Sequence, residues 1–229
     1  MRGINVFSIF VAIYFYDMAT IQYFTFNPFQ ENTYVLYDET KECVIIDPGC
    51  YDDSERKKLI SFIEDKKLKP VKLLNTHGHI DHMIGNKFIA EKYSLGLEMH
   101  KLDLPMLTRA VQTAAMYGVS IEPSPEPSKF IDEKDSIVFG NTSLSIFFTP
   151  GHSPGSICFY NKEEKFVIGG DVLFQNSIGR TDLPGGDFNT LINSIRTKLF
   201  VLDDAVKVYS GHGPVTTIGF EKQYNPFLI

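Results

Sequence analysis

Four apolar, strand-like segments of this chain each end in a histidine or an aspartate. They are VKLLNTH at 71–77, LSIFFTPGH at 144–152, KFVIGGD at 165–171 and VKVYSGH at 206–212. Ligands in α/β proteins gather outside the carboxyl ends of strands, where a rigid sheet positions the loop residues. We therefore expect the four terminal side chains to emerge at the same sheet edge and to form a ligand site there.

The first of these segments continues into a dense cluster of donors, Thr76-His77-Gly78-His79-Ile80-Asp81-His82. Neutral imidazole and carboxylate are ligands that borderline divalent metals prefer, and a His-x-His-x-Asp-His loop can direct its donors at two adjacent points. A lone histidine after a strand is more often a surface or core residue, but the shared placement favours ligation. The predicted dinuclear site has seven donors: His77, His79, Asp81, His82, His152, Asp171 and His212.

The periodicity of the remaining chain predicts strands alternating with helices. Strand-like segments cover 21–26, 33–37, 42–47, 71–75, 96–100, 135–140, 144–149, 156–160, 165–170 and 206–210. Helical patterns cover about 53–67 behind the N-cap Asp52, 83–93, a segment through Leu104 and Val111, and 187–202. The proline-rich segment 123–127 is predicted to be a surface loop. Two strand-rich halves that each carry helices predict an α/β fold, a four-layer αββα sandwich with two sheets face to face.

Composition excludes several classes of function. The 22 Lys and Arg against 28 Asp and Glu give a net charge of −6, so no nucleic-acid partner is expected. No apolar run reaches the roughly 18 residues of a spanning helix, so no membrane partner is expected either. The three cysteines are an odd set without metal-type spacing, which favours a reducing, cytoplasmic compartment.

The first 17 residues stand apart from the rest. An apolar run, 3–16, follows Arg2 and has the length of the core of a signal peptide. However, Asp17 closes the run, no small-x-small cleavage site follows, and Met18 opens directly into a strand pattern. We expect 1–17 to be an apolar extension translated from a spurious upstream start and 18–229 to be the folded domain that holds the predicted metal site. Export directed by 1–17 is the alternative.

The spacing of these motifs across about 20–229 resembles the metallo-β-lactamase superfamily. Within it, PGHSPGS at 150–156, GGDVLF at 169–174, GRTDLPGGD at 179–187 and GHGPVTTIG at 211–219 are similar to the short, single-domain members of the glyoxalase II (hydroxyacylglutathione hydrolase) group. The resemblance implies the metallo-β-lactamase fold and two metal ions, with zinc expected and iron or manganese as alternatives. It places His77, His79 and His152 on one ion. It places Asp81, His82 and His212 on the other, with Asp171 as the bridge.

The resemblance also implies a reaction, the hydrolysis of a small-molecule thioester similar to S-acylglutathione. Two ions about 3.5–4 Å apart can ionise a shared water, so no protein nucleophile is needed. Asp81 is expected to orient that water and Asp171 to set the metal separation. Glyoxalase II proper has a helical C-terminal domain that contributes to glutathione binding, and few residues follow His212, so the thiol half of the substrate stays open. The sequence does not indicate the oligomeric state.

Other activities of the same fold remain as alternatives. A persulfide dioxygenase would bind one iron through two histidines and an aspartate, and lactone hydrolases and β-lactamases use the same ionised water. A non-enzymatic protein with a metal that serves only folding is a further class.

Several residues have two interpretations. In the family pattern Asp47 supports the histidine loop, whereas from the residues alone it is equally a turn residue before Pro48. Arg180 is expected to pair with Asp182 and hold its loop, with binding of a substrate carboxylate as the alternative. His100 and Cys158 are predicted to be structural.

Overall fold

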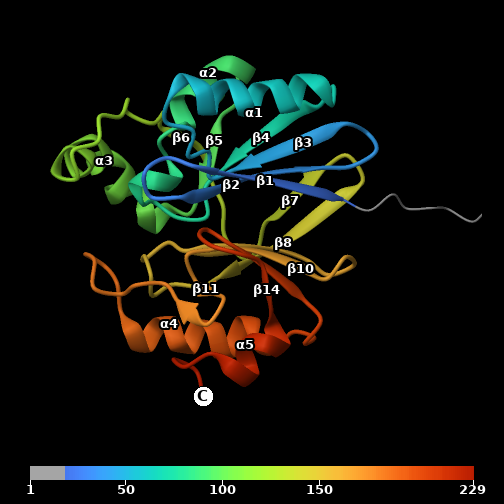
Figure 1. Ribbon diagram of the computed structural model, residues 1–229, viewed down its shortest axis with the longest axis vertical. Coiled ribbons are helices and arrows are strands. Elements are labelled where there is room, and N and C mark those ends of the chain that lie inside the picture. The colour runs from blue at the N-terminus through green and yellow to red at the C-terminus, as the bar shows by residue number, and fades with distance from the viewer. Residues whose placement is uncertain (1–18) are drawn as a thin grey trace, which may run out of the picture.

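The computed structural model describes residues 19–229, and the predicted extension at 1–17 lies outside this range. Four layers follow one another (Figure 1): helices α1 and α2, a first sheet, a second sheet, and helices α4 and α5. The predicted αββα sandwich is confirmed.

The first sheet has six strands in the order β1-β2-β3-β4-β5-β6. Their bounds are Thr20–Phe26, Glu31–Tyr37, Glu42–Ile46, Lys69–Leu74, Leu97–Met99 and Pro127–Phe130. The pairs β1–β2 and β2–β3 are antiparallel, and the pairs from β3 to β6 are parallel. The predicted loop at 123–127 ends one residue too late, because Pro127 begins β6. As the first residue of an edge strand, a proline costs the sheet little.

The second sheet has the order β14-β13-β10-β9-β8-β7. In chain order, β7 to β10 span Ser136–Phe139, Thr142–Phe148, Ile157–Asn161 and Phe166–Gly170, and β13 and β14 span Lys207–Ser210 and Thr216–Thr217. The antiparallel pairs β8–β9 and β9–β10 and the parallel pair β10–β13 make β8, β10 and β13 run in one direction. Their carboxyl ends therefore lie at the same end of this sheet. A two-stranded hairpin, β11 (Leu173–Phe174) and β12 (Ser177–Ile178), follows β10.

Alternation of side chains divides the core into three apolar layers. In β3, Cys43 and Ile45 face the helices of the first half, whereas Val44 and Ile46 pack between the sheets. In β10, Val167 packs with α4 and α5, and its neighbours Phe166 and Ile168 pack between the sheets. Because successive strand residues point to opposite faces, strands that are apolar throughout require cover on both sides, which the four-layer order supplies.

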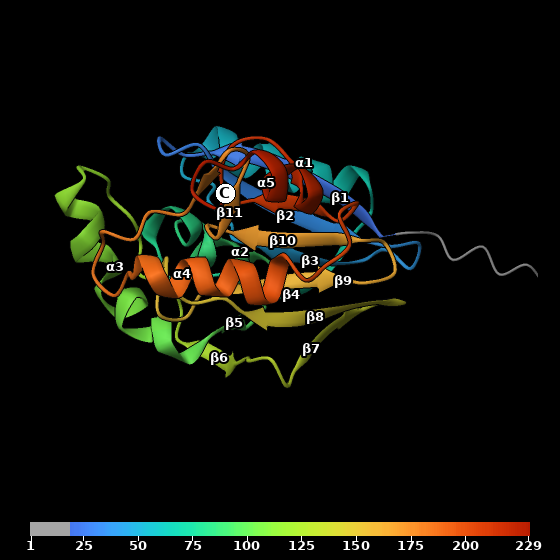
Figure 2. The same cartoon turned by 90° about the horizontal axis from the view of Figure 1, so that it is seen from below.

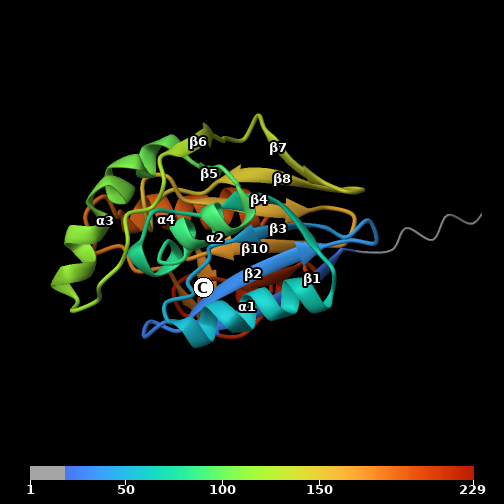
Figure 3. The ribbon, with the colours of Figure 1, turned by 90° about the horizontal axis from the view of Figure 1, so that it is seen from above.

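The helices cover the two outer faces. The α-helices are α1 (Asp53–Asp65), α2 (Asn86–Tyr93), α3 (Leu104–Met116), α4 (Phe188–Ser194) and α5 (Ile218–Tyr224). Helices α1 and α2 lie over the first sheet (Figure 3), and α4 and α5 lie over the second (Figure 2). Helix α3 lies beyond one end of the sheets in the same views.

Two helix boundaries differ from the prediction, and one helix was not predicted. Helix α2 begins at Asn86 rather than Met83, because the preceding residues form a short 3₁₀ turn, Ile80–His82 (η1). The predicted helix 187–202 is capped by Asp187 but continues after Ser194 as a π-helical turn, Ile195–Leu199. Helix α5 was not predicted. Within 19–229, no helix has both the length and the apolar character needed to cross a bilayer.

Candidate metal centre

The histidine loop leaves the end of β4 and is held in place by Asp47. One carboxylate oxygen of Asp47, Oδ1, accepts a hydrogen bond from the backbone N–H of Thr76 at 2.7 Å, and the other, Oδ2, accepts one from Thr76 Oγ1 at 2.6 Å. The Asn75 amide donates to Asp47 Oδ1 at 3.3 Å and to the carbonyl oxygen of His82 at 2.9 Å. Of the two interpretations of Asp47, the contacts match support of the histidine loop.

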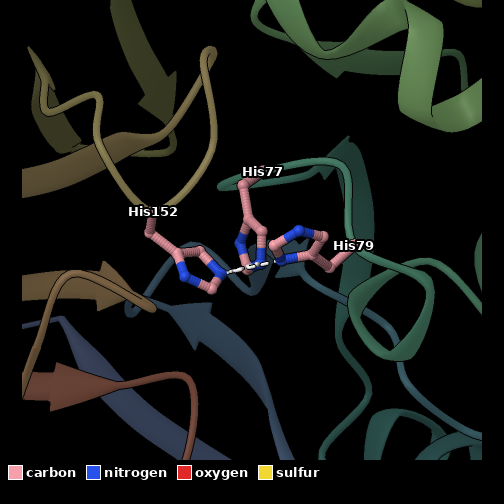
Figure 4. A group of neighbouring side chains, drawn as sticks. All are labelled: His77, His79 and His152. Atoms are coloured by element: carbon pink, nitrogen blue, oxygen red, sulfur yellow. Dashed lines mark hydrogen bonds between the residues drawn. The ribbon is translucent and has the colours of Figure 1, made fainter. Parts of the chain in front are cut away.

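Three imidazoles form the first group of donors (Figure 4). His152 Nε2 lies 2.7 Å from His79 Nδ1 and 3.2 Å from His77 Nε2. His77 and His152 are almost fully buried, while His79 is partly exposed. The three nitrogen atoms converge on one point, as ligands of a single ion do.

Asp81, His82 and His212 form the second group. His212 Nε2 lies 3.1 Å from Asp81 Oδ2, and His82 Nε2 lies 3.6 Å from the same oxygen. His82 is fully buried, whereas the side chains of Asp81 and His212 retain 14% and 27% of their exposure. The centre is therefore open to solvent on the side of Asp81, His212 and His79.

Asp171 lies between the two groups. Its Oδ1 is 3.4 Å from His82 Nε2 in the second group, and its Oδ2 is 3.5 Å from both His152 Nε2 and His212 Nε2. A single carboxylate thus faces donors of both groups, which is the geometry of a bridging ligand.

The opposite ring nitrogens have oxygen partners of their own. His152 Nδ1 lies 2.8 Å from the carbonyl oxygen of Arg180, and His212 Nδ1 lies 3.1 Å from that of Gln30. His82 Nδ1 lies 3.0 Å from Asp47 Oδ2. A carbonyl or carboxylate oxygen requires an N–H donor, so each Nδ1 carries a hydrogen, and in the neutral ring the nitrogen that faces the centre can bind a cation.

Burial and neighbouring charges divide the histidines into two kinds. Burial, together with nearby imidazoles, holds the pKa of His77 well below its usual range and lowers the pKa of His79 to about 3. Burial also opposes protonation of His82, but the carboxylates of Asp171 and Asp81 outweigh it and raise the pKa of His82 well above its usual range. The pKa of His212 is raised as well, since its hydrogen bond with Asp81 and the charge of Asp171 overcome burial.

The donor set fits a pair of divalent cations. In the described chain, His82 Nε2 and Asp171 Oδ1 are buried without a hydrogen-bond partner, although they face each other. Buried polar atoms are almost always satisfied, and a buried carboxylate ordinarily has a partner. A cation held between the two groups would satisfy both atoms.

The seven predicted donors come together, but not from one sheet edge as expected. His77, His79, Asp81 and His82 follow β4 of the first sheet. His152, Asp171 and His212 follow β8, β10 and β13 of the second sheet. The centre therefore lies across the ends of two sheets, because their stacking places the two sets of strand ends side by side.

The remaining predicted residues lie as follows. Arg180 makes a bidentate ion pair with Asp182, with both distances 2.7 Å, at the surface. His100 stacks on Phe148 with ring centroids 4.7 Å apart and belongs to neither group of donors. Cys158 is buried and unpaired.

Two buried carboxylates beside the centre were not predicted from the sequence. Glu31 is fully buried with its Oε1 3.9 Å from His82 Nδ1, and burial raises its pKa. Asp103 is fully buried against the loops that carry His77 and His152. Both lie distant in sequence from the histidines they approach, and no local pattern distinguishes them from a strand-edge residue and a helix cap.

Comparisons with known proteins agree with this geometry. Residues 26–212 match the model of the metallo-beta-lactamase superfamily. The chain is 40% identical to the probable metallo-hydrolase YqgX of Bacillus subtilis over 202 residues, which are 88% of this chain and 93% of that protein. It is 39% identical to the hydroxyacylglutathione hydrolase GloC of Haemophilus influenzae over 204 residues, which are 87% of this chain and 93% of that one.

Two solved structures share the arrangement of strands and helices. The crystal structure of the BLEG-1 B3 metallo-beta-lactamase matches with a TM-score of 0.84 and 39% identity, covering 91% of this chain and 99% of that one. The crystal structure of TTHA1623 in a di-iron-bound form matches with a TM-score of 0.82 and 37% identity, covering 90% and 100%.

Proposed function

The chain belongs to the metallo-β-lactamase superfamily, and from that premise we propose that it hydrolyses thioesters of the S-acylglutathione type. The family and the donor set support a metal-dependent hydrolase. The observation that carries the finer proposal is the 39% identity to a hydroxyacylglutathione hydrolase over 93% of that protein.

Two divalent ions would fit the centre: His77, His79 and His152 would hold one, and Asp81, His82 and His212 would hold the other, with the Asp171 carboxylate facing both groups. When bound, such ions supply Lewis acidity that polarises a substrate carbonyl and favours the ionisation of water near neutral pH. We propose zinc as the native metal. The di-iron form of a structural relative makes iron the metal to test against it.

The chain's own residues orient the donors and leave one side for the substrate. The carbonyl oxygens of Arg180 and Gln30 fix His152 and His212, so both rings face the centre. The partly exposed side chains of Asp81 and His212 border the open side, where the ring of Phe174 lies edge-on to His212 with centroids 6.2 Å apart. An acyl group entering there would meet one aromatic wall and the carboxylate of Asp81.

Cysteine chemistry offers no competing nucleophile. All three thiols, Cys43, Cys50 and Cys158, are buried, and burial raises the pKa of each to about 12. Because the thiolate is the nucleophilic form, these residues are inert at neutral pH. This supports direct attack by water, and three unpaired cysteines support a reducing, cytoplasmic site of action.

A second candidate is β-lactam hydrolysis, favoured by the 39% identity to a protein described as a B3 metallo-beta-lactamase. Both reactions add water to a carbonyl, so the centre serves either, and the difference lies in the leaving group.

A substrate panel on metal-analysed protein tests the proposal. S-lactoylglutathione, a chromogenic cephalosporin, an acyl-homoserine lactone and glutathione persulfide would be compared on protein of known zinc and iron content. We expect thiol release from S-lactoylglutathione at a kcat/KM at least about tenfold above that of any other substrate, with two ions per chain. Turnover of the cephalosporin alone would replace the proposal by its second candidate. One iron per chain with oxidation of the persulfide would overturn the hydrolase assignment.

A further inference from the structure

Asp103 occupies the position of a helix cap but does not act as one. It directly precedes α3, where an aspartate ordinarily accepts a hydrogen bond from the first turn of its own helix. Its side chain makes no such bond and is completely buried instead. A carboxylate that is buried and does not cap its own helix must accept hydrogen bonds from other groups.

These hydrogen bonds come from two loops that carry the predicted metal-binding histidines. Oδ2 accepts hydrogen bonds from the backbone N–H of Gly78 at 2.8 Å and from Ser153 Oγ at 2.7 Å. Oδ1 accepts one from the backbone N–H of Gly155 at 2.6 Å. Gly78 lies between His77 and His79, and Ser153 directly follows His152.

The glycines at these contacts are required by the same close approach. A Cβ at Gly155 would lie 2.7 Å from both Cγ and Oδ1 of Asp103. A Cβ at Gly78 would lie 3.0 Å from the Cβ of Asp103. Both loops are therefore built to bring their backbones against this carboxylate.

We infer that Asp103 is a positioning residue that joins the two histidine loops across the sheets and so sets the first metal site, formed by His77, His79 and His152. The loops leave β4 in the first sheet and β8 in the second, and one carboxylate accepts from both. The side chain of Asp103 makes no hydrogen bond with the second group, Asp81, His82 and His212. Loss of the Asp103 carboxylate should therefore loosen the first metal site and leave the geometry of the second unchanged. The inference rests on the proposed function only through the metal.

A backbone hydrogen bond also joins the same segments. The backbone N–H of Ile157 donates to the carbonyl oxygen of Thr76 at 2.9 Å. This bond survives any side-chain change at position 103, so the sheets remain joined. We therefore expect the loss of Asp103 to change the orientation of the histidines more than the overall fold.

The test measures metal affinity one site at a time. Asp103→Asn would be made in a His212→Ala background, which leaves the first group intact, and in a His79→Ala background, which leaves the second. Zinc affinity would be measured by competition with a chromophoric chelator, and Co²⁺ absorption would report the ligand geometry. We expect zinc affinity to fall about 10- to 100-fold in the first background, with an altered Co²⁺ spectrum, and to change less than about threefold in the second.

One further variant weakens the same contact, and another is the control for folding. Ser153→Ala removes one of the three donors and should give a smaller loss confined to the first site. Asp38→Asn alters another buried carboxylate that accepts hydrogen bonds from a turn, at the β7–β8 turn, and should leave both affinities unchanged. Equal losses at both sites, or a lower melting temperature with both affinities unchanged, would overturn the inference. Because the metal-affinity test uses no substrate, its result does not depend on the outcome of the thioester assay.

Discussion

Asp47 Oδ2 lies 3.0 Å from His82 Nδ1, and both side chains are buried. The carboxylate accepts the Nδ1–H, so Nε2 of His82 is left free to face Asp171 and Asp81. One hydrogen bond thus selects the tautomer of a ligand and, through the Thr76 contacts of the same carboxylate, holds the loop that carries it.

Asp47→Asn should therefore disable His82 without changing the size of the side chain. The amide that replaces Oδ2 donates rather than accepts, which favours the His82 tautomer with its proton on Nε2. We expect zinc affinity at the second site and kcat/KM to fall about 10- to 100-fold, as measured by chelator competition and thioester turnover. Asp182→Asn, at an exposed residue that pairs with Arg180, is the control. Unchanged affinity in Asp47→Asn would mean that Asp47 is only a turn residue.

Asp171→Asn should affect both metal sites at once. An amide nitrogen cannot bind a cation, and the negative charge shared by the two groups is lost. We expect the metal content to fall below two ions per chain and activity to fall by more than about 100-fold, beyond what supporting residues usually cost. Elemental analysis of the purified variant checks the first point. Full activity in this variant would indicate that the metal serves folding alone.

Proton release should differ between the two sites. His79, with a pKa of about 3, is neutral before metal binds, whereas His82 and His212 have raised pKa values and hold protons in the metal-free protein. Metals displace those protons, so affinity at the second site should weaken before affinity at the first as the pH is lowered. Calorimetry in buffers of different ionisation enthalpy, with the His212→Ala and His79→Ala variants, measures the release. Greater release from the His77, His79 and His152 site would contradict the charges described above.

Asp38 should make stability depend on pH at a point outside the metal centre. Burial opposes its ionisation, but hydrogen bonds from Thr40, Asn141 and Thr142 outweigh it and keep the pKa of Asp38 below its ordinary value. A carboxylate with a lowered pKa stabilises the fold above its unfolded pKa of about 3.9, and this stability is lost as the pH falls through the folded value.

Asp38→Asn should accordingly lower the free energy of unfolding by about 1–3 kcal/mol at neutral pH, and the difference from the wild type should shrink below about pH 4. Urea unfolding of both proteins at neutral pH and below about pH 4 measures this difference in the free energy of unfolding. A difference that stays constant with pH would show that charge is not the cause.

Much of the fold follows from local pattern. Continuous apolar runs in segments such as 42–46 indicate strands that are buried on both faces, and such strands require the four-layer order. Predicted boundaries were wrong where a tertiary contact interrupts a local pattern, as at α2, where the backbone N–H of Gly85 donates to the carbonyl oxygen of Pro48 at 2.7 Å. Helix α5 was missed for a related reason: in Ile218–Tyr224 only Ile218 and Glu221 are buried, which leaves too short an apolar pattern to detect.

The set of residues that gather at the candidate centre could be predicted from the sequence alone, because His77, His79, Asp81 and His82 share one loop and the other three each end a strand. How the donors divide between two sheets, which ring nitrogen faces the centre, and the role of Asp103 were decided only by the tertiary structure. Asp103 is 25 residues from Gly78 and 52 from Gly155. Contacts over such separations depend on how whole sheets pack, so the side-chain periodicity of one segment cannot predict them.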